Sequence, residues 1–154
     1  MRLYAIAFSD VAVSATQDLI NITATANEAL KIHYVEFGQK TLTSWEAKGL
    51  KLQRVPATVS AGSGGSALTP KPFNPGDAAA TFTARANDTT AMTTSGSMEL
   101  ILARDWEFLN GFFWMPAPEQ RPIIKPSQGF AINLPTAPSG SMTASGTVWV
   151  EELF

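Results

Sequence analysis

The chain contains no cysteine and only one histidine, His33. The missing thiols exclude disulfides, thiolate metal sites and cysteine nucleophiles. One histidine cannot supply the two or three imidazole ligands of a typical catalytic zinc site. A lone histidine on a strand is more often structural than a general base. We therefore expect neither catalysis by His33 nor a bound metal.

Charge is also scarce, because charged residues make up 16% of the chain against about 25% in typical soluble domains. The net charge is −2, and the basic residues are scattered without a run, so we expect no nucleic-acid or membrane partner. No stretch reaches the roughly 20 apolar residues of a membrane span. The opening MRLYAIAFSD is interrupted by Asp10 before it matches a signal peptide. The lack of cysteine fits a protein that folds in a reducing cytosol.

Short motifs for catalysis or cofactor binding are missing as well. No G-x-S-x-G elbow occurs, and the GSGG at Gly62–Gly65 lacks the Lys-Ser/Thr of a phosphate-binding loop. Asn87-Asp88 is better read as a polar turn than as a calcium ligand. A pair of carboxylates such as Glu36 and Glu99 remains open as a glycosidase site, although nothing singles it out. We expect no catalytic residue and no cofactor.

The main positive signal is period-2 alternation in short runs rich in β-branched and aromatic residues. The expected strands lie at Leu3–Phe8, Leu19–Ala24, Leu30–Phe37, Leu50–Gln53, Thr81–Thr83, Met98–Leu102, Phe130–Leu134 and Thr147–Val150. Only Leu42–Lys48 resembles a helix. This pattern predicts an all-β antiparallel sandwich, jelly-roll-like, as a single domain over residues 1–154.

The segment Pro56–Ala80 breaks the strand rhythm, because it holds four of the ten prolines and four of the eleven glycines. Proline cannot donate to a sheet ladder, and glycine weakens a strand. We expect a long internal loop outside the main sheets. Two interpretations stay open: a flexible connection between sheets, or an arm that contacts a neighbouring subunit. The candidate contact residues are Pro70, Pro72, Phe73 and Pro75.

A second unusual segment, Trp106–Met115, carries five of the fifteen aromatic residues. Asn110-Gly111 between apolar runs predicts a two-residue β-hairpin with a type I′ turn. Neighbouring side chains of a strand point to opposite faces, so some of these rings fill the core and others are free to meet another chain. A carbohydrate platform is the alternative. The candidate interface residues are Trp106, Phe108, Phe112, Phe113 and Trp114.

Three stretches give the chain a family resemblance: Ser66–Thr90, Arg121–Met142 and Thr143–Leu153. Rich in Ala, Ser, Thr, Gly and Pro and free of cysteine, the chain resembles the capsid decoration (cement) proteins of tailed bacteriophages. The resemblance implies a jelly roll, commonly trimeric, on the outer surface of the head at threefold or quasi-threefold positions. It implies no catalysis.

The expected function is that of a structural virion protein that stabilises the capsid by bridging major capsid protein subunits. The expected partners are further copies of the chain, as a homotrimer, and the major capsid protein. The alternative is a phage tail or receptor-binding module that binds carbohydrate. A hydrolase on a jelly-roll scaffold is a third hypothesis for the function.

Overall fold

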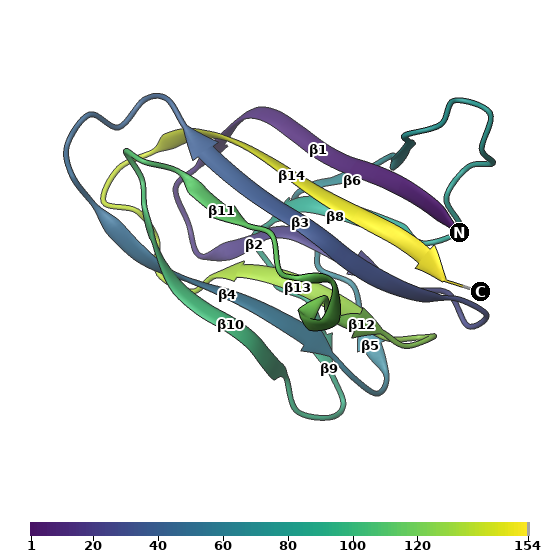
Figure 1. The fold of residues 1–154 in the computed structure, drawn as a ribbon. Coiled ribbons are helices and arrows are strands. Elements are labelled where there is room, and N and C mark those ends of the chain that lie inside the picture. Colours follow the sequence, from purple (N-terminus) through teal and green to yellow (C-terminus); the bar gives the residue numbers. More distant parts are fainter. Residues whose placement is uncertain (154) are drawn as a thin grey trace.

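A computed structural model describes residues 1–153 and contains two six-stranded antiparallel sheets (Figure 1). The first sheet has the order β11-β3-β14-β1-β7, with β12 beside β3. Its strands are β1 (Arg2–Val13), β3 (Ala29–Gln39), β7 (Lys71–Pro72), β11 (Phe112–Trp114), β12 (Ile123–Ile124) and β14 (Met142–Leu153). Strands β3, β14 and β1 are its long central members.

The second sheet has the order β10-β4-β13-β2-β8-β6. Its strands are β2 (Gln17–Thr23), β4 (Ala47–Val55), β6 (Ser66–Leu68), β8 (Thr83–Asp88), β10 (Glu99–Glu107) and β13 (Gly129–Leu134). A separate two-stranded sheet pairs β5 (Val59–Ser60) with β9 (Thr93–Thr94). Between β11 and β12 lies one 3₁₀ turn, η1 (Pro118–Gln120).

The alternation seen in the sequence explains the core. Along β14, buried and half-buried residues alternate from Met142 to Val150, so one face of the strand packs between the sheets. Strand β2 is different, because nearly all its residues are buried. A small second apolar cluster of Val55, Met92 and Ala131, with Val59 of β5 packed against it, forms apart from the main core.

The predicted all-β antiparallel sandwich is confirmed, but the helix expected at Leu42–Lys48 is wrong. Residues 40–46 form an irregular connection, and β4 begins at Ala47. Side-chain hydrogen bonds hold this connection, including two that Glu46 accepts from Ser139. Within residues 1–153, no helix is long and apolar enough to cross a membrane.

The hairpin predicted at Asn110-Gly111 is also wrong. Strand β10 pairs with β4 in the second sheet, whereas β11 pairs with β3 in the first. Gly111 has φ +73°, but Asn110 does not share this left-handed conformation, which a type I′ turn requires. Because Trp106, Phe108 and Phe112 are all buried in the main core, the chain crosses from one sheet to the other here. Burial of these rings overrides the local turn preference.

The Pro/Gly segment does not lie wholly outside the sheets, contrary to expectation. Ser66–Leu68 forms the edge strand β6, and Lys71–Pro72 pairs with Tyr4 and Ala5 of β1. The edge position explains how Pro72 is tolerated, since proline lacks the N–H of an inner strand. The segment therefore passes from one sheet to the other and joins them along one side.

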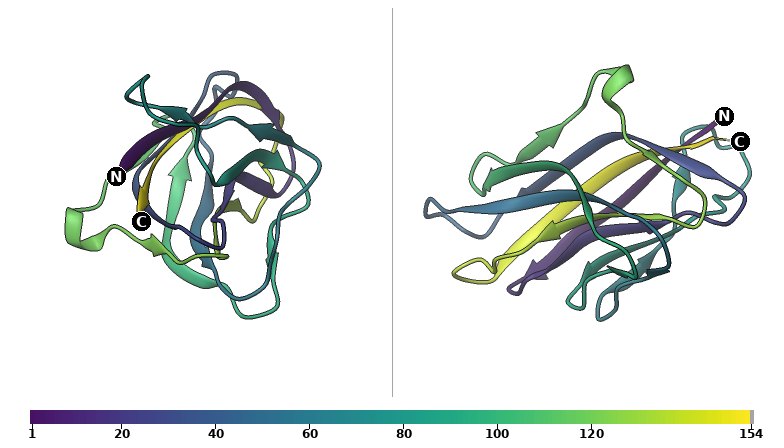
Figure 2. Two further views of the ribbon diagram at one scale, coloured as in Figure 1. Left: turned by 90° about the vertical axis from the view of Figure 1, so that its right-hand side faces the viewer. Right: turned by 90° about the horizontal axis from the view of Figure 1, so that it is seen from below.

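The last part of the segment, residues 73–80, projects beside the chain termini (Figure 1, upper right). Figure 2 (left) views the same end of the sandwich directly. Side chains tie down the base of this loop: Tyr4 Oη donates to Ala78 O at 3.0 Å, and Thr81 N donates to Glu152 Oε1 at 2.7 Å. The base of the loop is thus docked on its own chain.

Strand β1 carries a β-bulge. Its register with β14 shifts between Phe8 and Val11, and Asp10 has φ +57°. The Asp10 carboxylate is 2.7 Å from Lys40 Nζ. On its other side, β1 pairs with β7 only at Tyr4 and Ala5, so its second half has an open edge.

Candidate functional site

Four aromatic side chains form a continuous row across the outer face of the first sheet. Phe113 lies on β11, Tyr34 on β3, Trp149 on β14, and Phe73 directly follows β7. Tyr34 and Trp149 are direct partners in the β3–β14 register. The row therefore runs perpendicular to the strands, from one edge of the sheet to the other. We call these four residues the aromatic row.

The rings of the row touch one another. Tyr34 and Trp149 are stacked with centroids 4.3 Å apart. Phe113 meets Tyr34 edge to face at 5.4 Å, and Phe73 meets Trp149 in the same way at 5.3 Å. The two phenylalanines at the ends are the most open, with 51% of Phe113 and 50% of Phe73 exposed.

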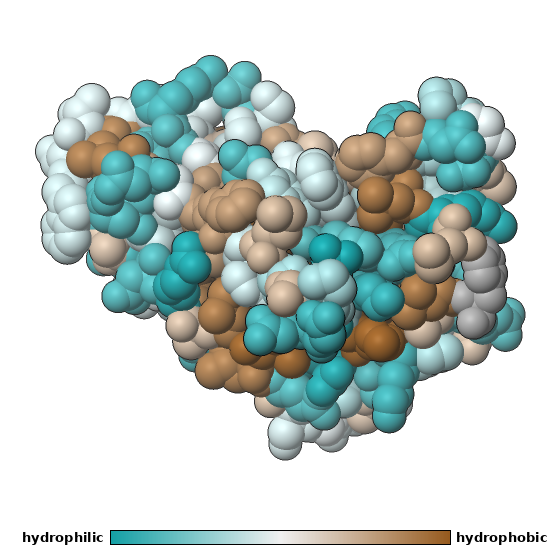
Figure 3. All heavy atoms as spheres, in the orientation of Figure 1, coloured by the Kyte–Doolittle hydropathy of each residue, from teal (hydrophilic) through white to brown (hydrophobic). Residues whose placement is uncertain are grey.

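The surface of this face is mixed. Figure 3 looks onto it and shows apolar patches separated by hydrophilic residues. The hydropathy scale that colours Figure 3 ranks tryptophan and tyrosine as mildly hydrophilic. Tyr34 and Trp149 of the row therefore add to the hydrophilic colour of this face. Arg104 donates to the carbonyl oxygen of Phe113 at 2.9 Å, and its guanidinium lies 4.8 Å from the ring centre of Phe112. Charged groups thus border the rings.

A carboxylate also adjoins the row. Tyr34 Oη donates a short hydrogen bond to Glu36 on the same strand. Ionising the phenol would place two negative charges together, so this contact raises the pKa of Tyr34 to about 12. Tyr34 therefore stays a neutral donor at all physiological pH values.

His33 lies beside the row but is fully occupied. The guanidinium of Arg121 donates to its Nδ1 at 2.9 Å, so Nδ1 has no hydrogen and Nε2–H donates to Glu151 at 2.7 Å. Lys31 adds a cation 3.8 Å from the same carboxylate. Because both ring nitrogens are engaged, His33 presents no free nitrogen to a substrate.

The predicted interface residues separate into three groups. Trp106, Phe108 and Phe112 lie in the core, where the rings of Trp106 and Phe108 contact edge to face at 4.8 Å. Phe113 and Phe73 belong to the aromatic row, and the remaining four residues lie outside it. Trp114, Pro70 and Pro72 are half-buried, and Pro75 is exposed.

The acidic candidates are not brought together. Glu36 lies on β3 in the first sheet and Glu99 on β10 in the second. Glu99 forms an ion pair with Arg54. Among residues 1–153 there is no cluster of three or more His, Cys, Asp or Glu that could hold a metal ion.

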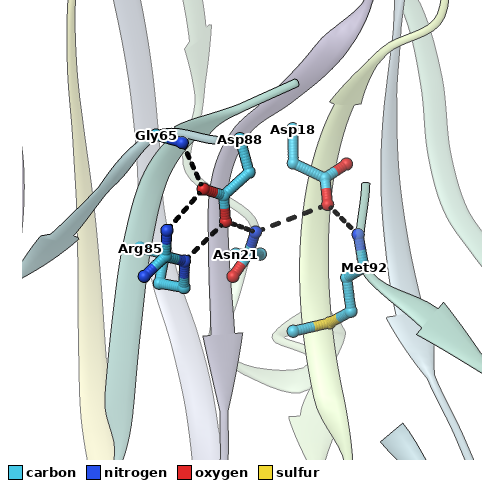
Figure 4. Close-up of polar contacts among 6 residues, drawn as sticks. All are labelled: Asp18, Asn21, Gly65, Arg85, Asp88 and Met92. Carbon is cyan, nitrogen blue, oxygen red and sulfur yellow. Dashed lines mark hydrogen bonds and ion pairs between the residues drawn. The ribbon is translucent and has the colours of Figure 1, made fainter. Parts of the chain in front are cut away.

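The polar turn expected at Asn87-Asp88 is wrong, because both residues end strand β8. Asp88 belongs to a buried polar network, drawn in Figure 4. The fully buried carboxylate of Asp88 accepts two bonds from Arg85, at 2.8 and 2.9 Å. It also accepts 2.9 Å bonds from Gly65 N and Asn21 Nδ2. The Asp88 carboxylate is therefore occupied by a guanidinium and shows no open ligand position.

A second buried carboxylate, Asp18, lies in the same network. It accepts from Met92 N at 2.7 Å and Asn133 Nδ2 at 2.9 Å. Burial raises the pKa of Asp18 despite these donors. Burial would also raise the pKa of Asp88, but Arg85, Asn21 and Gly65 lower it below its usual value. Both carboxylates are shielded from solvent, which gives them a structural role in fastening loops to the second sheet.

Sequence reasoning missed three exposed or half-exposed aromatic residues: Tyr34, Trp149 and Trp45. Trp149 alternates with the buried Val148 and Val150, so an aromatic residue at an outward strand position was the available signal there. Tyr34 shares the period-2 spacing of the buried Leu30 and Ile32, which predicted an inward position. It faces outward because the register between β3 and β14 shifts between Ile32 and Tyr34. Trp45, of which 72% is exposed, lies where a helix was expected.

The row and the polar groups around it form an open face. A hollow at β3 and β14 is lined by small or polar residues, Glu36, Gly38, Ser145, Gly146 and Thr147. An open aromatic face of this kind suits contact with another large surface. Comparison with protein-family models, with curated proteins and with solved structures finds no match for this chain.

Proposed function

We propose that the protein is a structural virion protein that binds the outer surface of a tailed-phage capsid and acts without catalysis. It stabilises the shell by bridging major capsid protein subunits, and it does so as a homotrimer. The observation that carries this proposal is the aromatic row on the open face of the first sheet.

The physical argument concerns how the row would bind. Aromatic side chains dominate the energetics of protein interfaces, and each buries about 150–250 Å² when covered. The rings are packed against each other before any partner arrives, so little side-chain freedom is lost on binding. Half-exposed phenylalanines at both ends leave each end of the row open to a contact of its own.

The order of the strands supports the jelly-roll part of the proposal. Leaving aside the short β5 to β9 region, the first strand pairs with the last, β1 with β14, and the second with the one before it, β2 with β13. Next, β3 adds to β14 and β4 adds to β13. This alternation between two sheets is what results when one long hairpin wraps around a core, as in double Greek-key jelly rolls.

The absence of catalysis in the proposal rests on geometry. Glu36 and Glu99 lie in different sheets, each with its own partner. Both nitrogens of His33 are engaged. A hydrolase would need a proton donor or acceptor that faces an open cleft.

A phage tail or receptor-binding module is the second candidate. The aromatic row favours it less, because a sugar ring stacks on an open aromatic face and Tyr34 already covers one face of Trp149. The exposed Trp45 is the observation that favours it, and the site around this residue is developed below.

The test uses heads of the same phage assembled without this protein. Purified protein should co-sediment with them saturably, and the decorated heads should release DNA at a higher temperature, because a ligand of the intact lattice stabilises it by mass action. The double variant Phe73→Ser/Phe113→Ser should bind at least about tenfold more weakly. Leu100→Ser, at a residue of β10 that is 54% exposed, is the matched control and should bind normally. Failure of the wild-type protein to co-sediment would overturn the proposal.

A further inference from the structure

Trp45 is the most exposed aromatic side chain among residues 1–153, with 72% of its surface open to solvent. It lies in the connection between β3 and β4, at the end of the sandwich opposite the chain termini (Figure 1, left). A large ring normally gains stability by burial. An indole as exposed as this one either binds a ligand or lies on a loop that is too flexible to pack it.

The loop is not loose. The Gln39 side chain alone makes four hydrogen bonds: its Oε1 accepts from Thr41 N and Leu42 N at 2.9 and 2.7 Å. Its Nε2 donates to Leu42 O at 3.0 Å and to Phe108 O at 3.1 Å. These bonds fix the start of the loop to the body of the sandwich.

The far side of the loop is held as well. Glu46 Oε1 accepts from Ser139 N at 2.8 Å, and its Oε2 accepts from the Ser139 hydroxyl at 2.6 Å. Thr143 N donates to the hydroxyl of Thr41 at 2.7 Å. Both flanks of Trp45 are thus anchored to the 139–143 segment, so the loop presents the indole in a preorganised way.

The indole stands in an open hollow of about 460 Å³. Apart from Trp45 and Leu42, every residue that lines it carries a hydroxyl or carboxylate: Thr41, Thr43, Ser44, Glu46 and Ser139. Lys48 is paired with Glu46 at 3.3 Å. Hydrogen bonds from Ser139 lower the pKa of Glu46, in spite of some burial, so it is ionised at neutral pH.

This combination of groups selects one class of ligand. A sugar ring offers a face of C–H groups that stacks on an aromatic ring, and hydroxyls that bond to serine, threonine and carboxylate oxygens. A peptide anchor would need an apolar, desolvated pocket instead, and an anionic ligand would meet the Glu46 carboxylate. We propose that Trp45, with Thr43, Ser44 and Ser139, forms a binding site for an uncharged saccharide. The site lies on a loop separate from the aromatic row and goes beyond the capsid role, since it would let a decorated head adhere to glycans.

The experiment follows the indole N–H signal of Trp45 in ¹H–¹⁵N spectra of the whole protein. The probes are chitotriose, cellotriose, maltotriose and lactose, each titrated into the millimolar range. At least one should shift the Trp45 signal saturably. Trp45→Ala should weaken that binding at least about tenfold, and Trp45→Phe should weaken it less, because a smaller ring remains. Leu109→Ala, at another exposed apolar residue, should leave it unchanged.

Two results would overturn the proposal: no saturable shift with any of the four sugars, or binding that survives Trp45→Ala unchanged. Head binding gives an independent readout. Trp45→Ala should co-sediment with undecorated heads as the wild type does. The saccharide site and the capsid role are therefore tested independently of each other.

Discussion

Asparagine in place of Asp88 is the sharpest perturbation of the buried network, because the two side chains have nearly the same shape. The new carbonyl oxygen can still accept from Gly65 N and from one Arg85 nitrogen. The new amide group would then face Arg85 Nε and Asn21 Nδ2, which are both donors. Two N–H groups would lose their acceptor.

The magnitude follows from those contacts. A buried group left without a partner costs about 1–3 kcal/mol. Arg85 is 27% exposed and can turn to water. Asn21 is buried and keeps only a long 3.5 Å contact with Asp18, so most of the cost falls on Asn21, with the lost ion pair added. We expect Asp88→Asn to lower the free energy of unfolding by about 2–4 kcal/mol. For a chain of this length, that is a fall in Tm of roughly 5–15 °C.

Acidification supplies a second readout. The pKa of Asp88 is lowered in the folded protein, so its contribution is fully present above the unfolded pKa and is lost as the pH falls through the folded pKa. The stability difference between wild type and Asp88→Asn should therefore be largest near pH 7 and shrink below about pH 4.

The assay is urea unfolding at pH 7 and pH 2.5, at one fixed protein concentration because association would shift the midpoint. The exposed Asp105→Asn is the matched control and should change stability by less than about 0.5 kcal/mol. A loss under about 1 kcal/mol for Asp88→Asn, or an equal loss at both pH values, would show that the carboxylate is not what fastens these loops.

Three further predictions concern the core, the aromatic row and assembly. A Cβ at Gly146 would lie 2.4 Å from the Phe37 ring and 2.8 Å from Phe8 Cε1, so Gly146→Ala should destabilise the protein by about 1–3 kcal/mol; an unchanged urea midpoint would refute this. Glu36→Gln should lower the pKa of Tyr34 from about 12 toward the ordinary value near 10, as followed by phenolate absorbance, and an unchanged titration would show that Glu36 is not the cause. Light scattering after size exclusion should give three times the 16.5 kDa of one chain; a monomer at tens of micromolar would argue against a trimer that forms without the capsid.

Strand periodicity predicted the sandwich because each core face is encoded locally. Tyr4, Ile6 and Phe8 alternate along β1, and all three are buried. The same logic placed Phe130, Ile132 and Leu134 correctly on β13. Here, local sequence and tertiary burial agree.

The incorrect predictions lie where residues distant in the sequence determine the local backbone structure. Asn110-Gly111 is a strong local hairpin signal, yet the burial of Trp106 and Phe112 sends the chain across to the other sheet. Leu42–Lys48 has a helix-like composition, but Gln39 and Glu46 hold it in an irregular loop through partners as far away as Ser139. No local pattern reveals such partners.

The candidate site was predictable only in part. Phe113 and Phe73 came from aromatic and proline-rich segments, whereas Tyr34 and Trp149 are neighbours only because β3 pairs with β14. A row across a sheet is a property of register between strands. It cannot be read from a single strand.

The bulge in β1 has a consequence for how copies coexist. Beyond Ala5 the strand leaves its outer edge unpaired, and a straight open edge would invite the sheet of another molecule to join it, producing chains of fused sheets. The left-handed Asp10 bends the strand at this point, and its pair with Lys40 places charges beside it. Bends and charges are the features that keep natural sheet edges from joining. Copies can therefore be crowded at high local density and remain discrete molecules, meeting one another through side chains instead of through a shared backbone ladder.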